Sequence, residues 1–313
     1  MMSYLIKQFA LLVILLLGIS SSMAQSQSIK MVFVGDIMLD DLPGKYIKAG
    51  KDPFKSFAPL LKQADITIGN LECVVGTTGE PEDKPFVLRA NPRVLPVLQK
   101  YFSAVSLANN HTGDYGPKAL SKMLELLDEA SLKHFGAGKE IRSAHEPIIF
   151  EVKGKRIAVL GFDIFLPRSF EALDDRPGSA WGEPDYIVAD IKRAKDFYRA
   201  DVVITYPHWG WEGEKTASQN QVQLAHLMID SGADAVVGGH PHVTQNIENY
   251  KGKPIFYSLG NFIFDGFDTV DTTTGWALEI MINPDSKITW QINEAKLSKN
   301  GIPGNYGVIL RSD

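Results

Sequence analysis

Short apolar runs recur along this chain, and a polar motif follows each of them directly. The runs are continuous rather than alternating in polarity, which is typical of strands whose two faces are both covered by helices. We therefore predict a sheet strand at each run. The predicted strands are Met31–Val34, Ile66–Ile68, Ala104–Leu107, Ile157–Leu160, Val202–Thr205, Ala235–Val237 and Ile255–Tyr257.

Segments with helical spacing of apolar residues lie between these runs. They are Phe54–Gln63, Pro117–Ala130, Asp185–Arg199 and Ser218–Ser231. Near the C-terminus, Trp276–Ile282 and Ile288–Glu294 instead resemble an antiparallel pair of strands around a turn. Arg168–Gly182 is a polar loop that contains proline. The order of elements predicts an α/β fold in which the sheets are mixed.

The first residues of the chain resemble a secretory signal. Lys7 precedes an apolar run from Phe9 to Ile19, and Ser22-Met23-Ala24 offers a site for signal peptidase. The alternative is a membrane anchor, but a spanning helix needs about 20 apolar residues and this run is shorter. We therefore expect an exported protein, soluble in the periplasm or outside the cell. The predicted division is signal peptide 1–24, linker 25–29, one domain 30–297 and a C-terminal tail 298–313.

Composition narrows the possible functions. The chain has 313 residues, a formal net charge of −5 and no run of Lys and Arg, so nucleic acid is not an expected partner. An anionic substrate would need local positive charge, from a metal or from a few placed basic residues. Cys73 is the only cysteine, which excludes an intramolecular disulfide and leaves stability to the hydrophobic core.

The histidines indicate where the chemistry lies. Open α/β sheets bind ligands beyond the carboxyl ends of their strands. Four of the seven histidines follow predicted strands in this way: His111, His208, His240 and His242. The other three, His134, His145 and His226, do not, and we interpret them as ordinary surface or core residues.

His240-Pro241-His242 is the strongest local signal for a metal. Two imidazoles on one loop can turn toward one point, and imidazole binds zinc, iron, manganese or nickel. Two histidines placed there by chance are the alternative. Asp36 and Glu72 follow the first two predicted strands, and a carboxylate can bridge two cations. The alternatives are a helix N-cap for Asp36 and a solvated turn for Glu72.

Asn109-Asn110-His111 follows the third predicted strand. Asn110 offers a carbonyl oxygen to a metal, and His111 offers a proton to a leaving group, unless the segment is simply a turn. We predict that substrate contacts come from Arg89, Asn109, Trp209 and Asn261. For Arg89 the alternative is a surface arginine. Trp209 and Trp211 either wall the site or pack the loop, and we favour packing for Trp211.

Taken in order, these residues resemble the CapA family, the poly-γ-glutamate capsule biosynthesis proteins within the calcineurin-like metallophosphatase superfamily. The matching motifs extend over most of the chain after the predicted signal. They are Val34-Gly35-Asp36, Gly69-Asn70-Leu71-Glu72, Asn109-Asn110-His111, His208-Trp209-Gly210, Gly239-His240-Pro241-His242 and Ser258-Leu259-Gly260-Asn261-Phe262.

The resemblance implies a four-layer αββα sandwich of two mixed sheets, with one or two divalent ions of Mn, Fe or Zn at one end. Asp36 and His242 would hold one ion. A second ion would take Asn110, His208 and His240, with Glu72 as the bridging ligand and His111 as an acid outside the metal shell. The superfamily usually has a histidine two residues after the first aspartate, where this chain has Met38. Methionine is a poor ligand for a hard cation, so the first metal position is expected to be the weaker.

Two functions remain open from the sequence. The first is a metal-dependent hydrolase that acts on a small phosphoester or amide, or on an anionic envelope polymer such as poly-γ-glutamate. The second is a non-catalytic, metal-assisted component of a capsule synthesis or export machine, with membrane capsule-synthesis proteins as partners. A structural domain with a vestigial metal site is a third possibility.

Overall fold

The computed structural model describes residues 27–304 and 307–312. Its larger sheet has eight strands in the order β18-β17-β16-β1-β2-β5-β6, and β15 pairs with β1 outside this path. β1, β2, β5 and β6 run parallel, whereas β16, β17 and β18 are antiparallel to their neighbours. The strands are β1 (Ile29–Ile37), β2 (Ile66–Leu71), β5 (Ala104–Ser106), β6 (Lys133–Phe135), β15 (Asn261–Ile263), β16 (Thr274–Ile282), β17 (Ile288–Lys296) and β18 (Val308–Arg311).

The second sheet has six strands in the order β13-β14-β12-β11-β9-β8. Its four inner strands are parallel, and the two edge strands are antiparallel to them. The strands are β8 (Ile148–Val152), β9 (Lys155–Asp163), β11 (Val202–His208), β12 (Ala235–Val237), β13 (Ile247–Tyr250) and β14 (Lys253–Phe256). Two short pairs stand apart from these sheets: β3 (Val74–Val75) with β4 (Arg89–Ala90), and β7 (Ala137–Gly138) with β10 (Gly178–Ser179).

Three layers of apolar side chains hold the sheets and helices together. Side chains of a strand alternate between its faces, so Met31 and Phe33 of β1 enter the core between the sheets. Val32 and Val34 face the other way, into a second core under the helices of the larger sheet. Ile187 of α7 and Met228 of α8 pack on the smaller sheet. Burial on both faces explains why the sequence shows continuous apolar runs.

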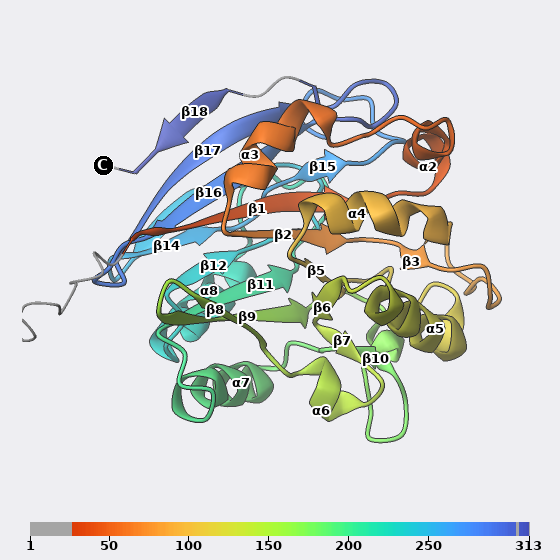
Figure 1. Cartoon of the computed structure of the whole chain (residues 1–313). Helices are drawn as coiled ribbons and strands as arrows, with labels where there is room; N and C mark the ends of the chain where they lie inside the picture. Colours follow the sequence, from red (N-terminus) through yellow and green to blue (C-terminus); the bar gives the residue numbers. More distant parts are fainter. Residues whose placement is uncertain (1–26, 305–306, 313) are drawn as a thin grey trace, which may run out of the picture.

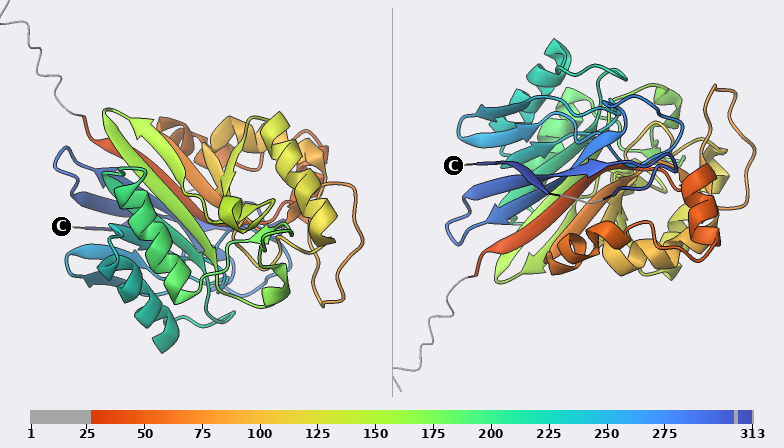
Figure 2. Two further views of the ribbon diagram at one scale, coloured as in Figure 1. Left: turned by 90° about the horizontal axis from the view of Figure 1, so that it is seen from below. Right: turned by 90° about the horizontal axis from the view of Figure 1, so that it is seen from above.

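The helices cover the two outer faces, so the predicted four-layer αββα sandwich with mixed sheets is confirmed (Figures 1 and 2). Outside the larger sheet lie α2 (Asp41–Lys48), α3 (Ala58–Gln63), α4 (Leu95–Tyr101) and α5 (Gly116–Glu129). The other helices are α6 (Ile141–Ala144), α7 (Pro184–Asp196) and α8 (Gln219–Asp230). Short 3₁₀ turns span Lys55–Phe57, Pro92–Val94 and Arg168–Phe170.

The two ends of the chain differ in what the structure describes. The predicted signal peptide lies outside the described residues. Part of the predicted C-terminal tail forms strand β18, which pairs with β17 at the edge of the larger sheet (Figure 1). In the described part of the chain, no helix is long and apolar enough to cross a bilayer.

A close backbone contact fixes the end of β1, where Asp36 stands. The Asp36 amide donates to the Gly260 carbonyl at 3.0 Å, and β15 begins one residue after that carbonyl. The pairing of β1 with β2 and with β15 shifts register here, as in a β-bulge, which re-aims side chains at a strand end. A Cβ on Gly35 would lie 1.8 Å from the Gly260 oxygen. Only glycine fits at position 35.

We predict that Gly35→Ala lowers the free energy of unfolding by about 3 kcal/mol or more, because β15 must move away to admit the methyl group. Urea denaturation measures the change. Gly76→Ala is the matched control, since a Cβ at this buried glycine meets nothing within 4 Å. Equal losses of stability in the two variants would contradict the assigned contact.

Candidate functional site

The ends of strands from both sheets bring the predicted metal residues together. Asp36 is the last residue but one of β1, Glu72 follows β2, and Asn110 with His111 follows β5. From the smaller sheet, His208 ends β11, and His240 and His242 follow β12. All seven side chains are buried, with at most 7% of their surface exposed. The site therefore lies between the two sheets, at the carboxyl ends of their parallel strands.

Two groups of potential metal ligands share the Glu72 carboxylate. One group is Glu72, His208 and His240, and the other is Asp36, Glu72 and His242. Within each group the ligand atoms lie within 4.8 Å of one another. A carboxylate common to both groups occupies the position of a bridge between two ions.

The histidine-rich position has nearly the spacing of a metal site. His208 Nε2 lies 2.8 Å from Asn110 Oδ1 and 3.1 Å from His240 Nδ1. Glu72 Oε1 lies 3.6 Å from the same His208 nitrogen. Ligands bound to zinc at about 2.1 Å in tetrahedral geometry lie about 3.4 Å apart. Asn110, which the sequence predicts as a ligand, therefore belongs with this group.

The second position is less complete. His242 Nε2 lies 3.7 Å from Glu72 Oε1, and its Nδ1 lies 3.6 Å from Asp36 Oδ2. Asn261 Oδ1 accepts from His242 Nδ1 at 2.9 Å, which leaves Nε2 as the free lone pair. Met38 lies beside this position, and its sulfur accepts the Asp40 amide at 3.1 Å.

The loop carrying both histidines has a strained backbone. His240 has φ 96° and His242 has φ 56°, in the left-handed region that costs energy for residues with a Cβ. The His240 amide donates to Asp36 Oδ2 at 3.2 Å, which ties the loop to β1. Gly239 permits this approach, because a Cβ there would lie 2.8 Å from Asp36 Oδ1. Strained backbone of this kind is typical of loops that hold side chains in position for a ligand.

The charges of the site fit a divalent cation. Both Glu72 oxygens and His240 Nε2 are buried and have no hydrogen-bond partner among the described residues. Burial and the nearby Asp36 raise the pKa of Glu72 well above its usual range. Burial and the neighbouring imidazoles lower the pKa of His208 and of His240 far below theirs. A cation would satisfy the Glu72 oxygens and would bind each neutral imidazole through one of its nitrogens.

His111 stands outside both ligand groups and faces a cleft beside His242. Asp114 Oδ2 lies 2.7 Å from its Nδ1, and Lys84 forms an ion pair with the other Asp114 oxygen at 2.5 Å. Burial lowers the pKa of His111, and the hydrogen bond to Asp114 opposes this effect. Because Nδ1 is held by Asp114, Nε2 is the nitrogen left to exchange a proton with a ligand.

Sequence reasoning missed the residues that orient the site. Asn70 donates to Asp36 Oδ1 at 2.8 Å and lies 3.2 Å from His208 Nδ1. Asp114 and Lys84 hold His111, and Lys84 also donates to the Asn110 carbonyl at 2.8 Å. Asn70 lies inside one of the quoted motifs and Asp114 lies close to another, so their positions in the sequence could have indicated a role at the site. Lys84 lies in a polar loop, where the sequence gives no such indication.

The predicted substrate residues occupy other places. Asn109 and Asn261 are fully buried and hold the Asn70 and His242 side chains, respectively. Trp209 is buried, and its indole N–H donates to the Tyr257 carbonyl at 2.9 Å, so it packs the core. The guanidinium of Arg89 lies over the Tyr115 ring, 4.0 Å from its centroid. None of these four residues lines the cleft at His111.

The tryptophan that reaches the surface is Trp211, not Trp209. Trp211 is 63% exposed and makes an edge contact with Phe165, at 5.7 Å between ring centroids. Phe165 in turn lies on the His240 ring, with centroids 3.7 Å apart. Our sequence interpretation favours packing for Trp211, whereas the structure leaves it largely exposed, with the Phe165 ring between it and His240. Trp209 follows His208 directly and faces the core, and the chain then turns at Gly210, where φ is 88°, so that Trp211 is exposed.

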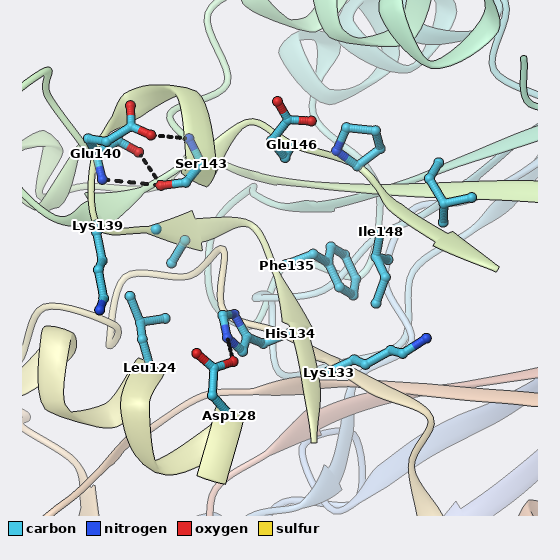
Figure 3. Close-up of a pocket in the computed structure, with 14 residues that line it drawn as sticks. Leu124, Asp128, Lys133, His134, Phe135, Lys139, Glu140, Ser143, Glu146 and Ile148 are labelled. Carbon is cyan, nitrogen blue, oxygen red and sulfur yellow. Dashed lines mark hydrogen bonds and ion pairs between the residues drawn. The ribbon is translucent and has the colours of Figure 1, made fainter. Parts of the chain in front are cut away.

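A pocket larger than the cleft at His111 lies elsewhere and has different chemistry. It has a volume of about 750 Å³ and lies between α5, β6 and α6 (Figure 3). His134 contacts Asp128 there at 3.2 Å, and Glu140 caps α6. Neither metal-ligand group found among the described residues includes a residue of this pocket. His145 and His226 likewise contact the carboxylates of Asp190 and Glu248, in keeping with their interpretation as ordinary residues.

Comparison with known proteins assigns the family. Residues 30–266 match the profile of the bacterial capsule synthesis protein PGA_cap. The chain belongs to this family. It is 36% identical to the capsule biosynthesis protein CapA of Bacillus anthracis, over 77% of this chain and 61% of that protein. It is also 36% identical to the PGA biosynthesis protein CapA of Bacillus subtilis, over 74% of this chain and 62% of that one.

The family assignment confirms the resemblance to CapA proteins. The chain covers about three fifths of the length of these PGA_cap relatives. Among solved structures, it aligns with the NAD nucleotidase NadN of Haemophilus influenzae at 13% identity and a TM-score of 0.49, over 91% of this chain and 54% of that one. That similarity is too low to carry an argument about the site.

We predict that Glu72→Gln stabilises the metal-free protein at about pH 8 by about 1–2 kcal/mol. The raised pKa of Glu72 means that the native state keeps a proton that the unfolded chain loses above pH 4.5. Wild-type stability therefore falls as pH rises through that range, and glutamine does not titrate. The gain should shrink at about pH 5. Added Mn²⁺ should reverse the order, because the wild type binds it more tightly.

Glu279→Gln is the control for this prediction. Glu279 is buried but accepts hydrogen bonds from partners that include Asn293, and Lys30 pairs with it. These contacts lower its pKa, so its charge stabilises the protein above pH 4.5 and the variant should lose stability at pH 8. Denaturation with and without metal measures both variants. A Glu72→Gln variant less stable than the wild type without metal would contradict the prediction.

Proposed function

We propose that this PGA_cap protein is an exported, metal-dependent hydrolase of cell-envelope polymer metabolism, acting on a phosphoester or amide bond. One observation carries the proposal: the Glu72 carboxylate is shared by two ligand groups and has no other partner among the described residues. His111, which lines a cleft with His242, is the candidate acid. A buried charge without a partner is costly, so a role in binding cations explains why it is there.

The residues divide between two metal positions. Asn110, His208 and His240 would hold one ion, Asp36 and His242 the other, and Glu72 both. Bound Mn²⁺, Fe²⁺ or Zn²⁺ would supply Lewis acidity and a nucleophile derived from water at neutral pH. Asn70 and Asn261 keep Asp36 and His242 turned toward these positions through their hydrogen bonds. This arrangement orients the ligands before a substrate arrives.

His111 supplies the proton in this proposal. Asp114 fixes the ring through Nδ1, so that Nε2 can donate to the leaving oxygen or nitrogen of the substrate. Lys84 neutralises Asp114, which keeps that carboxylate from attracting the proton too strongly. The lowered pKa of His111 makes it a ready donor once protonated.

Different observations support the two other parts of the proposal, which are export and a role in polymer metabolism. The apolar run from Phe9 to Ile19 supports export, and the names of the two CapA relatives support a role in capsule or poly-γ-glutamate metabolism. Membrane proteins of capsule synthesis are the proposed partners.

We predict that His111→Ala lowers kcat by about 10²–10⁴-fold without removing bound metal, because His111 lies outside both ligand groups. Turnover of phosphoesters and γ-glutamyl amides by the Mn²⁺-loaded protein tests this, alongside metal analysis. The Asp114→Asn variant should lose less activity than His111→Ala, and the pH dependence of its kcat should be shifted. His134→Ala is the matched control, since its imidazole also contacts an aspartate but far from the metal ligands. Equal turnover in His111→Ala and wild type would refute the catalytic role.

One observation favours a second function, that of a non-catalytic polymer-binding component. Met38 stands beside the weaker metal position and offers only a thioether whose sulfur already accepts an amide. A single ion at the histidine-rich position would then anchor a carboxylate-bearing chain. Tight binding of poly-γ-glutamate that needs one metal ion, with no turnover on the same substrate panel, would favour this function.

A further inference from the structure

The cleft above the metal ligands has a distinctive lining. It encloses about 320 Å³ and reaches from His111 and His242 to the surface. We call it the acidic cleft, because its three charged side chains are all carboxylates and the described lining includes no lysine or arginine. Its lining consists of Met38, Asp41, Phe86, Leu88, His111, Glu212, His242, Phe264, Asp265, Gly266 and Phe267.

The carboxylates of the acidic cleft lie beside the metal site. Glu212 lines the cleft together with His111 and His242, so its carboxylate borders the candidate metal ligands. Burial, with Asp41 nearby, raises the pKa of Asp265, which accepts the Leu42 amide at 2.9 Å. Asp41 also has an exposed partner, Lys45, at 4.0 Å. Unlike Asp41, Glu212 and Asp265 form no ion pair with a basic side chain in the described part of the chain, so they are the carboxylates most available to a ligand.

Aromatic rings make up the rest of the mouth of the cleft. Phe86 is 74% exposed, an unusual position for so large an apolar side chain. Phe267 is half-buried and packs against the His242 ring, with centroids 4.9 Å apart. The faces of such rings carry negative potential and attract cations, and carboxylates do so more strongly. Rings and carboxylates around one small cleft together favour an organic ammonium ion.

We propose that the acidic cleft selects substrates that carry an ammonium group, and that Glu212 and Asp265 bind this group. This inference rests on the proposed function, because the bond to be cleaved would lie over Glu72 and His111. It also limits how a polymer enters. A run of substrate carboxylates would meet the cleft carboxylates and be repelled, whereas the amino end of a peptide would be attracted. A volume of about 320 Å³ admits a small terminal unit rather than an extended chain.

Non-hydrolysable ligands test the inference independently of turnover. Calorimetric titration of the Mn²⁺-loaded protein compares aminoethyl-, aminopropyl- and aminobutylphosphonate with alkyl phosphonates of equal length, which differ by an ammonium group in place of a methyl group. We expect the best amino ligand to bind about tenfold more tightly than its alkyl counterpart. Glu212→Gln and Asp265→Asn should each reduce this preference, and the double variant should abolish it. Asp268→Asn, on the same exposed segment but outside the lining, should leave it unchanged.

The outcomes separate this inference from the proposed function. Equal binding of the two ligand series, or no binding of either, overturns the inference even if the protein turns over a substrate. A preference for amines that survives in the double variant also overturns it. A preference that the double variant loses supports the inference even if no hydrolysis is found. A γ-glutamyl dipeptide and its N-acetyl derivative then identify the source: weaker binding after acetylation assigns the cleft to peptide amino ends, and equal binding assigns it to phosphoesters of amino alcohols.

Discussion

The Glu72 carboxylate, buried at 0% exposure between two sheets, is the constraint on which the rest of the site depends. An ionised carboxylate without a partner is far too costly to bury, so it must be protonated or bind a cation. The histidines around it offer no compensating positive charge, because burial favours their neutral forms. Only a cation satisfies the carboxylate and the imidazoles at the same time. The packing of one sheet on the other places the buried carboxylate next to the neutral imidazoles.

The site also depends on polar groups that hydrogen-bond to the candidate ligands and hold them in place. Asn70 links Asp36 to His208, so it joins a ligand of the larger sheet to one of the smaller sheet. The His240 amide makes another link across the sheets, to Asp36. The close contact of Gly35 with Gly260 sets where β1 ends relative to β15. A shift between the sheets would therefore break the metal positions before it disturbed the apolar core, which is why the fold and the site are specified together.

Sequence reasoning predicted which candidate ligands come together, because strand ends are where parallel sheets gather polar residues and each motif follows an apolar run. It could not assign the directions of long or neighbouring side chains. Trp209 and Trp211 are two residues apart, and only the path of the chain after β11 decides which is buried. Arg89 bends over Tyr115 through contacts between segments distant in sequence. Strand β18 was missed because its short apolar run, Val308–Leu310, lies in a Gly-rich segment and remains exposed at the edge of the sheet.

The asymmetry of the two metal positions follows from the same packing. The histidine-rich position has three candidate ligands besides Glu72, which are Asn110, His208 and His240, whereas the other has Asp36 and His242 alone. Met38 is itself part of the apolar core and only 2% exposed, so it contributes packing where a further ligand would otherwise stand. The weaker position also opens onto the acidic cleft through His242. An ion there would gain its missing ligands from the substrate, so binding of the second ion and of the substrate should be mutually reinforcing.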